Sequence, residues 1–121
     1  MDDRLRFFKH KNQTLLLIDF SQGSKRELLA LLPQVRATIT GHARNSVLVL
    51  ADFTSAQIDK AVAARMKEVL VFDRPYVKRS AWVGTESLPK VFYDGFKTFS
   101  QREFPTFTTR EEAMDWLVKD S

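Results

Sequence analysis

Two short, uninterrupted runs of aliphatic residues constrain the fold of this chain more than any other feature. They lie at residues 15–18 and 47–51. A strand with one face in water alternates apolar and polar residues, whereas a strand covered on both faces reads as a continuous apolar run. Both runs are far shorter than the roughly twenty apolar residues that a membrane-spanning helix needs. We therefore predict that the two runs form the centre of a sheet that is covered on both faces.

Each central strand is followed by residues that are typical of a helix start. A hydroxyl side chain followed three residues later by Glu or Gln can satisfy the unpaired backbone donors of the first helical turn. Within the first predicted helix, Pro33 should kink or split the helix because it removes a backbone donor. Three capping pairs predict helix starts: Ser24 with Glu27, Thr54 with Gln57, and Thr109 with Glu112.

Strand and helix patterns alternate along the chain, with no linker that would separate a second domain. A further strand is expected at residues 76–83, a third helix follows residues 84–87, and residues 104–107 form a short strand at most. This alternation favours parallel pairing with right-handed crossovers. We therefore predict one α/β domain over residues 1–121, with a mixed, mainly parallel sheet of four to five strands and helices on both faces. The first strand, residues 5–8, should run antiparallel in an N-terminal hairpin.

The composition agrees with an ordinary globular domain. Hydrophobic residues make up 44% of the chain and charged residues 28%, so the domain can bury a core without staples. Because the chain has no cysteine, disulfides and thiolate metal sites are excluded. The first four residues, Met-Asp-Asp-Arg, do not resemble a signal peptide. We expect a cytoplasmic location and no membrane span.

Two segments of the sequence are similar to a known family. They are residues 74–84, RPYVKRSAWVG, and residues 107–117, FTTREEAMDWL, and a strand that ends in aspartate at residues 47–52 adds to the likeness. On these features the chain resembles the SpoIIAA-like group of small bacterial proteins, whose fold is related to STAS and Sec14-like domains. The resemblance runs from about residue 14 to residue 119. It implies a STAS-like α/β fold and a binding or regulatory role.

The resemblance also raises the question of a phosphorylation switch. STAS anti-sigma-factor antagonists carry a phosphorylatable serine in an Asp-Ser-Ser-Gly-like turn at the start of the helix after a central strand. This chain lacks that motif, and its nearest hydroxyls are those of Thr54 and Ser55. Phosphorylation at these two residues is a minor hypothesis.

The connections after the central strands gather hydroxyls and glycines at the carboxyl edge of the predicted sheet. Open parallel sheets bind ligands at this edge because helix N-termini meet there. One hypothesis is an anion or nucleotide site that Lys78 or Arg79 approaches from a neighbouring loop. The alternative is that each hydroxyl only caps its own helix. The donor set of the hypothetical site is Ser24, Thr54, Ser55, Gly84 and Thr85.

Few residues of the sequence are suited to catalysis or metal binding. Asp19 and Asp52 end adjacent predicted strands and could together hold a divalent cation. Aspartates are also common in turns at strand ends, and we favour that interpretation. The two histidines, His10 and His42, fall at the opposite, amino edge of the sheet, out of reach of the hydroxyls. We therefore predict a protein that is not an enzyme and that has no metal or cofactor.

Aromatic residues concentrate in the third predicted helix. Phe92, Phe96 and Phe99 recur at helical spacing, which is typical of core residues. Some of them could instead line an apolar pocket or a dimer patch. In the last helix, Trp116 and Leu117 are predicted to be buried anchors, because a terminal helix stays attached only by docking its apolar stripe.

Basic side chains outnumber acidic ones in the second half of the chain. Residues 60–102 contain nine Lys and Arg against four Asp and Glu. Such an excess can attract nucleic acid or anionic lipid. Since no RNA-binding motif accompanies it, we expect a solvated basic surface and no nucleic-acid partner.

Taken together, these features favour a non-enzymatic regulatory or protein-interaction module of SpoIIAA-like type. A protein partner or self-association is expected for such a module. The alternative is a small-molecule carrier, whose ligand is either anionic at the carboxyl edge of the sheet or apolar beneath the third helix.

Overall fold

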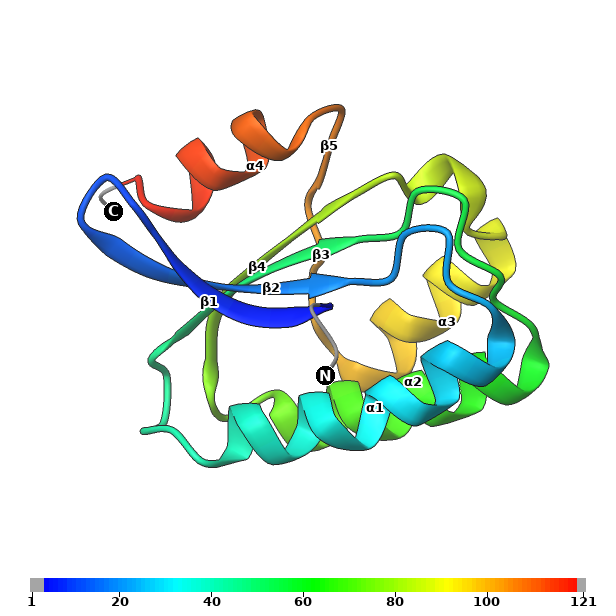
Figure 1. The fold of residues 1–121 in the computed structure, drawn as a ribbon. Coiled ribbons are helices and arrows are strands. Elements are labelled where there is room, and N and C mark those ends of the chain that lie inside the picture. The colour runs from blue at the N-terminus through cyan, green and yellow to red at the C-terminus, as the bar shows by residue number, and fades with distance from the viewer. Residues whose placement is uncertain (1–3, 120–121) are drawn as a thin grey trace.

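A single sheet, with its strands in sequence order, forms the middle of the protein (Figure 1). The structure is a computed structural model and describes residues 4–119. The strands are β1 (Leu5–His10), β2 (Gln13–Asp19), β3 (Val47–Asp52), β4 (Val77–Val83) and β5 (Thr106–Phe107). Strand β1 pairs antiparallel with β2, and the other neighbours pair in parallel. The predicted mixed sheet and its antiparallel N-terminal hairpin are confirmed.

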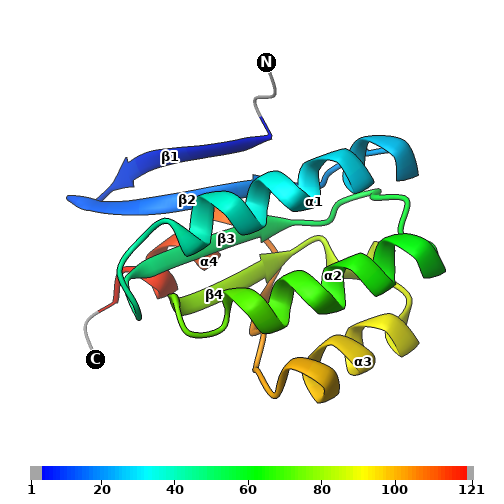
Figure 2. The same ribbon diagram turned by 90° about the horizontal axis from the view of Figure 1, so that it is seen from below.

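Helices cover both faces of the sheet, as predicted, but unequally. Three long helices, α1 (Lys25–Thr40), α2 (Lys60–Asp73) and α3 (Lys90–Ser100), lie side by side on one face (Figures 1 and 2). Among residues 4–119, only α4 (Arg110–Leu117) lies on the other face. A short 3-10 turn, η1 (Thr85–Ser87), follows β4. No helix within residues 4–119 combines the length and the hydropathy that crossing a membrane would take.

The continuous apolar runs are explained by two separate cores. In β2, Leu16 and Ile18 pack toward α1, α2 and α3, while Leu15 and Leu17 pack toward α4. All six residues of β3 are buried, and its five apolar residues divide between the two cores in the same way. The larger core is centred on Trp82, whose ring stacks on Phe104 with the ring centroids 4.1 Å apart.

Strand β4 contains a bulge near its amino end. Val77 pairs with Val47, but Arg79 pairs with the next residue of β3, Leu48. Lys78 is therefore an extra residue in the ladder, and the side-chain alternation of β4 shifts by one position there. Beyond the bulge, Ser80 and Trp82 are buried on the side of the three long helices.

The predicted start of α2 is wrong, and the predicted split of α1 at Pro33 is not found. Thr54 does not cap α2, which begins at Lys60 and is capped by Asp59, whose carboxylate accepts a hydrogen bond from the Val62 amide over 2.9 Å. Pro33 does not split α1, which continues to Thr40. Burial of α1 residues on both sides of the proline, Leu31, Leu32 and Val35, holds the helix together despite the missing donor.

The aromatic face of α3 is only partly buried. Phe96 is fully buried against Trp82, and Phe92 is half-buried. Phe99, by contrast, is 57% exposed, although its spacing predicts a core position. The helix lies at the end of the helical layer, so a narrower stripe faces the core than its sequence pattern indicates (Figure 2).

The two predicted anchors of α4 differ in their burial. Leu117 is buried in the smaller core, as predicted. Trp116 is only half-buried, so the prediction of complete burial is wrong. Its ring packs beside Phe107, with centroids 5.7 Å apart, and the Arg79 guanidinium lies 5.4 Å from its centre.

These burials predict a clear order of stability losses. Leu117→Ala should destabilise the protein by about 2–4 kcal/mol, because it opens a cavity in the smaller core. Trp116→Ala should cost less, about 1–2 kcal/mol, since its ring is not completely buried. Urea denaturation of both variants measures these losses. A larger loss for Trp116→Ala than for Leu117→Ala would contradict this account of the smaller core.

Candidate functional site

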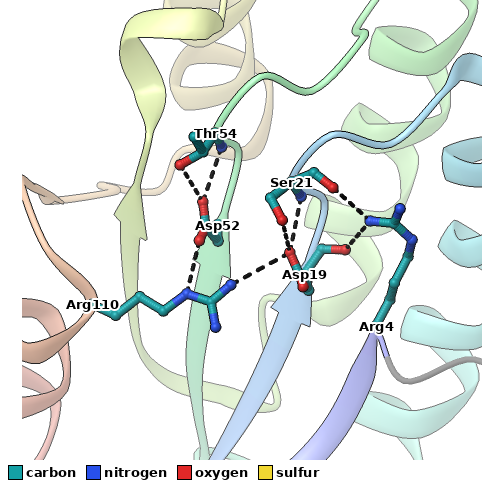
Figure 3. A network of polar contacts seen from close by, with 6 residues as sticks. All are labelled: Arg4, Asp19, Ser21, Asp52, Thr54 and Arg110. Atoms are coloured by element: carbon teal, nitrogen blue, oxygen red, sulfur yellow. Dashed lines mark hydrogen bonds and ion pairs between the residues drawn. The ribbon is translucent and has the colours of Figure 1, made fainter.

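The carboxyl edge of the sheet carries a network of charged side chains (Figure 3). Asp19 and Asp52 are the last residues of β2 and β3 and are direct partners in the parallel ladder. Arg110, the first residue of α4, reaches over the end of the sheet toward both of them. Its Nε donates to Asp52 Oδ2 over 2.8 Å, and its Nη2 lies 3.5 Å from Asp19 Oδ1. The terminal helix is thereby tied to two inner strands.

Asp52 is the most buried member of this network. The residue is 6% exposed. Its Oδ1 accepts hydrogen bonds from the Thr54 amide, over 2.9 Å, and from Thr54 Oγ1, over 2.7 Å. Burial by itself raises the pKa of Asp52, but the hydrogen bonds from Thr54 and Arg110 outweigh it and lower the pKa below its ordinary value. The carboxylate is ionised and fully engaged at neutral pH.

Asp19 is held from two sides. Its Oδ1 accepts hydrogen bonds from the amide and the hydroxyl of Ser21. On the far side from Arg110, Arg4 Nη1 donates to the backbone oxygens of Asp19, over 3.0 Å, and Ser21, over 2.8 Å (Figure 3). Arg4 Nη2 lies 3.7 Å from a carboxylate oxygen of Glu27 at the start of α1. Arg4 thus joins the sheet edge to α1, as Arg110 joins it to α4.

This arrangement is suited to holding the fold together. The guanidinium of Arg110 fills the place between the two carboxylates that a divalent cation would need. Within residues 4–119, no group of three or more His, Asp or Glu side chains could hold a metal ion. The histidines lie at the amino edge, where His10 Nε2 is 2.8 Å from Asp115 Oδ1 and His42 Nδ1 is 2.8 Å from the Thr38 carbonyl oxygen. They are placed as the sequence predicts.

Sequence reasoning found the two aspartates but missed the role of Arg110. The available signal was its position directly after Thr109, the N-cap of α4, at the start of a helix that must cross the sheet. A long cationic side chain at that position can reach the ends of inner strands. Nothing local in the sequence pairs it with residues more than fifty positions away.

The hydroxyls of the hypothetical anion site are largely engaged in internal hydrogen bonds. Thr54 donates both its amide and its hydroxyl hydrogen to Asp52. The Ser55 amide donates to Ser87 Oγ over 3.0 Å. Ser24 forms a complete capping box with Glu27, as predicted. The structure places Thr54, Ser55 and Gly84 together, with Ser24 in a neighbouring loop.

Gly84 packs tightly against Thr54, and the predicted basic partners of this site lie elsewhere. A Cβ on Gly84 would lie 2.3 Å from Thr54 Oγ1, and its φ of 70° is left-handed. A side chain at this position would therefore strain the fold itself. Thr85 follows in η1 and lines a shallow polar groove with Glu86 and Glu112. Lys78 and Arg79 lie at the other end of β4 and do not approach this edge, so that part of the prediction is wrong.

A small enclosed cavity lies between the sheet and helices α1 and α2. Its volume is about 30 Å³, which is room for about one water molecule. Its lining is apolar apart from Asp73, Ser80 and Arg102, and it does not include Phe92, Phe96 or Phe99. Asp73 is 2% exposed, and its Oδ1 has no hydrogen-bond partner within residues 4–119. Burial raises the pKa of Asp73 to about 7, and the charges of Arg102 and Arg36 only partly oppose this shift.

Comparison with known proteins places the fold. No family model matches the sequence, and no curated protein matches it either. A solved structure from Shewanella loihica PV-4, an uncharacterised protein of the DUF3478 family with a SpoIIAA-like fold, aligns with 93% of this chain and 91% of its own chain. The TM-score is 0.71 and the sequence identity is 17%. The chain has a SpoIIAA-like fold.

The SpoIIAA-like fold confirms the architecture that the sequence resemblance implies. It also agrees in detail with the mixed sheet and the helices on both of its faces. At 17% identity the similarity concerns the fold alone, so the role of the protein must be argued from its own side chains.

Removal of the Arg110 clamp should weaken the SpoIIAA-like fold in a pH-dependent way. We expect Arg110→Met to lose on the order of 1–3 kcal/mol at pH 7, because Asp52 keeps its charge in a buried place without a counter-charge. The pKa of Asp52 is lower in the folded protein than in the unfolded chain. Its ionised form therefore contributes stability above about pH 4, and this contribution is lost as the pH falls further. The difference between Arg110→Met and wild type should therefore shrink in acid. Urea denaturation at pH 7 and pH 3, with Glu111→Gln as a surface control, measures it. A loss that is the same at both pH values would contradict an ionic clamp.

Asp73 should produce the opposite pH dependence. Its folded-state pKa is raised, so the folded protein binds the proton more tightly than the unfolded chain, and stability falls as the pH rises from about 4 to about 7. Asp73→Asn removes this penalty. The free energy of unfolding of the variant, minus that of wild type, should therefore be higher at pH 8 than at pH 4 by on the order of 1–3 kcal/mol. The measurement is a series of urea melts from pH 4 to pH 8, with Glu86→Gln as the control. If Asp73→Asn and wild type change in parallel over this range, the raised pKa is wrong.

Proposed function

We propose that this protein is a non-enzymatic regulatory or protein-interaction module that acts in the cytoplasm. The observation that carries the proposal is a set of exposed apolar side chains on the three long helices. We call this the helical surface. It consists of Leu29 on α1, Val71 and Phe72 on α2, and Val91 and Phe99 on α3, which are between 37% and 72% exposed. Large apolar groups in water at neighbouring positions are typical of a surface that binds another protein.

A groove between α1 and α2 gives the helical surface its shape. The groove has a volume of about 550 Å³, and its apolar lining includes Leu29, Pro33 and Val69. Cations accompany the apolar groups. The Arg36 guanidinium lies 3.6 Å from the centre of the Phe72 ring, and Lys67 Nζ lies 5.9 Å from that of Phe99. These cations favour a protein partner that presents acidic residues around an apolar side chain.

The same charges argue against a second copy as the partner. A symmetric dimer would bring Arg36, Arg65 and Lys67 of one chain against the same surface of another, and only Arg65 has a carboxylate partner there, Glu68 at 3.2 Å. Like charges that face each other are costly in an interface. We therefore favour a different, acidic protein over self-association.

The polar chemistry of the carboxyl edge supports a role without catalysis. Asp19 and Asp52 are neutralised by Arg110 and hydrogen-bonded by Ser21 and Thr54. A general base or nucleophile needs a free reactive group with a partner that activates it. The alternative function, a carrier with an apolar ligand beneath the helices, would require space there, and the enclosed cavity offers about 30 Å³.

Native mass spectrometry of protein purified gently from cells distinguishes these roles. An interaction module should appear as bare protein or in a complex with an acidic protein, whereas a carrier should retain a small molecule. Phe72→Ser and Phe99→Ser should abolish the protein complex, and high salt should weaken it. Phe7→Ser is the matched control, because Phe7 is 42% exposed and lies on β1, not on the three long helices.

The complex must also form again from its purified components. Binding of the purified partner to wild type and to Phe7→Ser, but not to Phe72→Ser, would support the proposal. A retained apolar small molecule, or a dimer that survives both helical-surface substitutions, would contradict it.

A further inference from the structure

A second groove, at the amino edge of the sheet, carries the densest group of cations in the described part of the chain. It has a volume of about 400 Å³ and lies between the start of β4, the segment before β5, and α4. We call it the basic groove. The charged residues that line it are Arg74, Lys78, Arg79 and Arg102, together with one acid, Glu103. Trp116 forms an apolar wall.

The bulge in β4 creates this concentration of charge. In a regular strand, neighbouring side chains point to opposite faces of the sheet. Because Lys78 is the extra residue of the bulge, Lys78 and Arg79 both line the basic groove. Bulges commonly re-aim side chains at functional sites. Here the bulge brings two adjacent cations onto one side.

Within residues 4–119, Arg74, Lys78 and Arg79 have no carboxylate partner, whereas Arg102 interacts at longer range with the charge of Asp73. Within residues 4–119, none of the four forms an ion pair, whereas Lys25, Lys90 and Arg110 elsewhere do. Three of them are instead steadied by neutral acceptors. Arg79 Nη1 donates to the Trp116 and Lys119 carbonyl oxygens over 3.0 and 2.8 Å, Arg102 Nη1 to the Leu70 carbonyl oxygen over 3.1 Å, and Arg74 Nη1 to Gln101 Oε1 over 3.4 Å. Their positive charges are left for an external anion.

The floor of the basic groove holds a further hydrogen-bonding group. Ser80 is 7% exposed, and its hydroxyl makes no hydrogen bond within residues 4–119. It lines both the basic groove and the enclosed cavity, as does Arg102. A phosphate oxygen bound above the strand would give this hydroxyl an acceptor.

We propose that the basic groove binds the diphosphate or triphosphate group of a small ligand. Four cations in one groove match the several negative charges of such a group, and guanidinium groups bind phosphate oxygens in a bidentate manner. The volume falls within the range of small-ligand sites. The ligand is either free pyrophosphate or tripolyphosphate, or a nucleotide whose base packs against Trp116. This site is separate from the helical surface and from the carboxyl edge.

Isothermal titration calorimetry with pyrophosphate, tripolyphosphate, ADP and ATP, at about 0.15 M salt, tests the proposal. We expect binding that Lys78→Gln and Arg74→Gln each weaken about tenfold, which corresponds to roughly 1.4 kcal/mol. Ser80→Ala should weaken it about threefold. Arg26→Gln is the matched control, because it removes one positive charge from the exposed first turn of α1, outside the basic groove. Circular dichroism and thermal melts establish that each variant is folded.

The source of the phosphate group is read from the same titrations. Binding of ATP that is tighter than that of tripolyphosphate, with the difference removed by Trp116→Leu, identifies a nucleotide. Equal affinities identify a free polyphosphate. Either result supports the basic groove as the site, provided that Lys78→Gln weakens binding.

Several results would overturn the proposal. One is the absence of binding by all four compounds at millimolar concentration. Another is a loss of affinity that is equal in Arg26→Gln and Lys78→Gln. The third is a loss of affinity in Thr54→Val that exceeds the loss in Lys78→Gln. The last result would place the anion at the carboxyl edge of the sheet. Tighter binding of a single-stranded oligonucleotide than of any small phosphate through Lys78 and Arg74 would point to nucleic acid and would also overturn it.

Discussion

Burial of β3 on both faces is the constraint on which the rest of the structure depends. A strand with six buried residues needs cover above and below, and the chain provides three long helices for one face but only the eight-residue α4 for the other. Apolar contacts through Ala113 and Leu117 hold α4 at one side, and the Arg110 clamp on Asp52 and Asp19 holds its first turn. The buried carboxylate of Asp52 therefore serves to hold α4 against the sheet.

This use of the carboxyl edge changes where function is to be sought. Open parallel sheets commonly bind ligands at that edge, because helix N-termini and strand ends converge there. In this protein Asp52 accepts both Thr54 donors, and Gly84 packs closely against Thr54. Unpaired charge lies at the opposite, amino edge, and exposed apolar side chains lie on the helical surface. The proposed functions follow this distribution.

The sequence predicts the architecture well and the polar contacts poorly, for physical reasons. Continuous apolar strands and capping pairs are local patterns, so the sheet, its antiparallel hairpin and the caps at Ser24 and Thr109 can be predicted. The start of α2 cannot be predicted in this way, because Thr54 hydrogen-bonds to Asp52 and does not cap the helix. The Arg110 clamp and the basic groove depend on pairing between distant segments and on a one-residue bulge in β4, which no local pattern indicates.

The central claim is that the ionised Asp52 carboxylate, through Arg110, holds α4 on the second face of the sheet. An NMR titration that follows the Asp52 carboxyl carbon together with the amide exchange of α4 tests it most directly. The account predicts that Asp52 titrates below the ordinary range of aspartate and that the protection of the α4 amides falls in the same pH interval, while that of the β3 amides persists. An Asp52 that titrates at or above the ordinary value, with α4 protection unchanged through the transition, would contradict it.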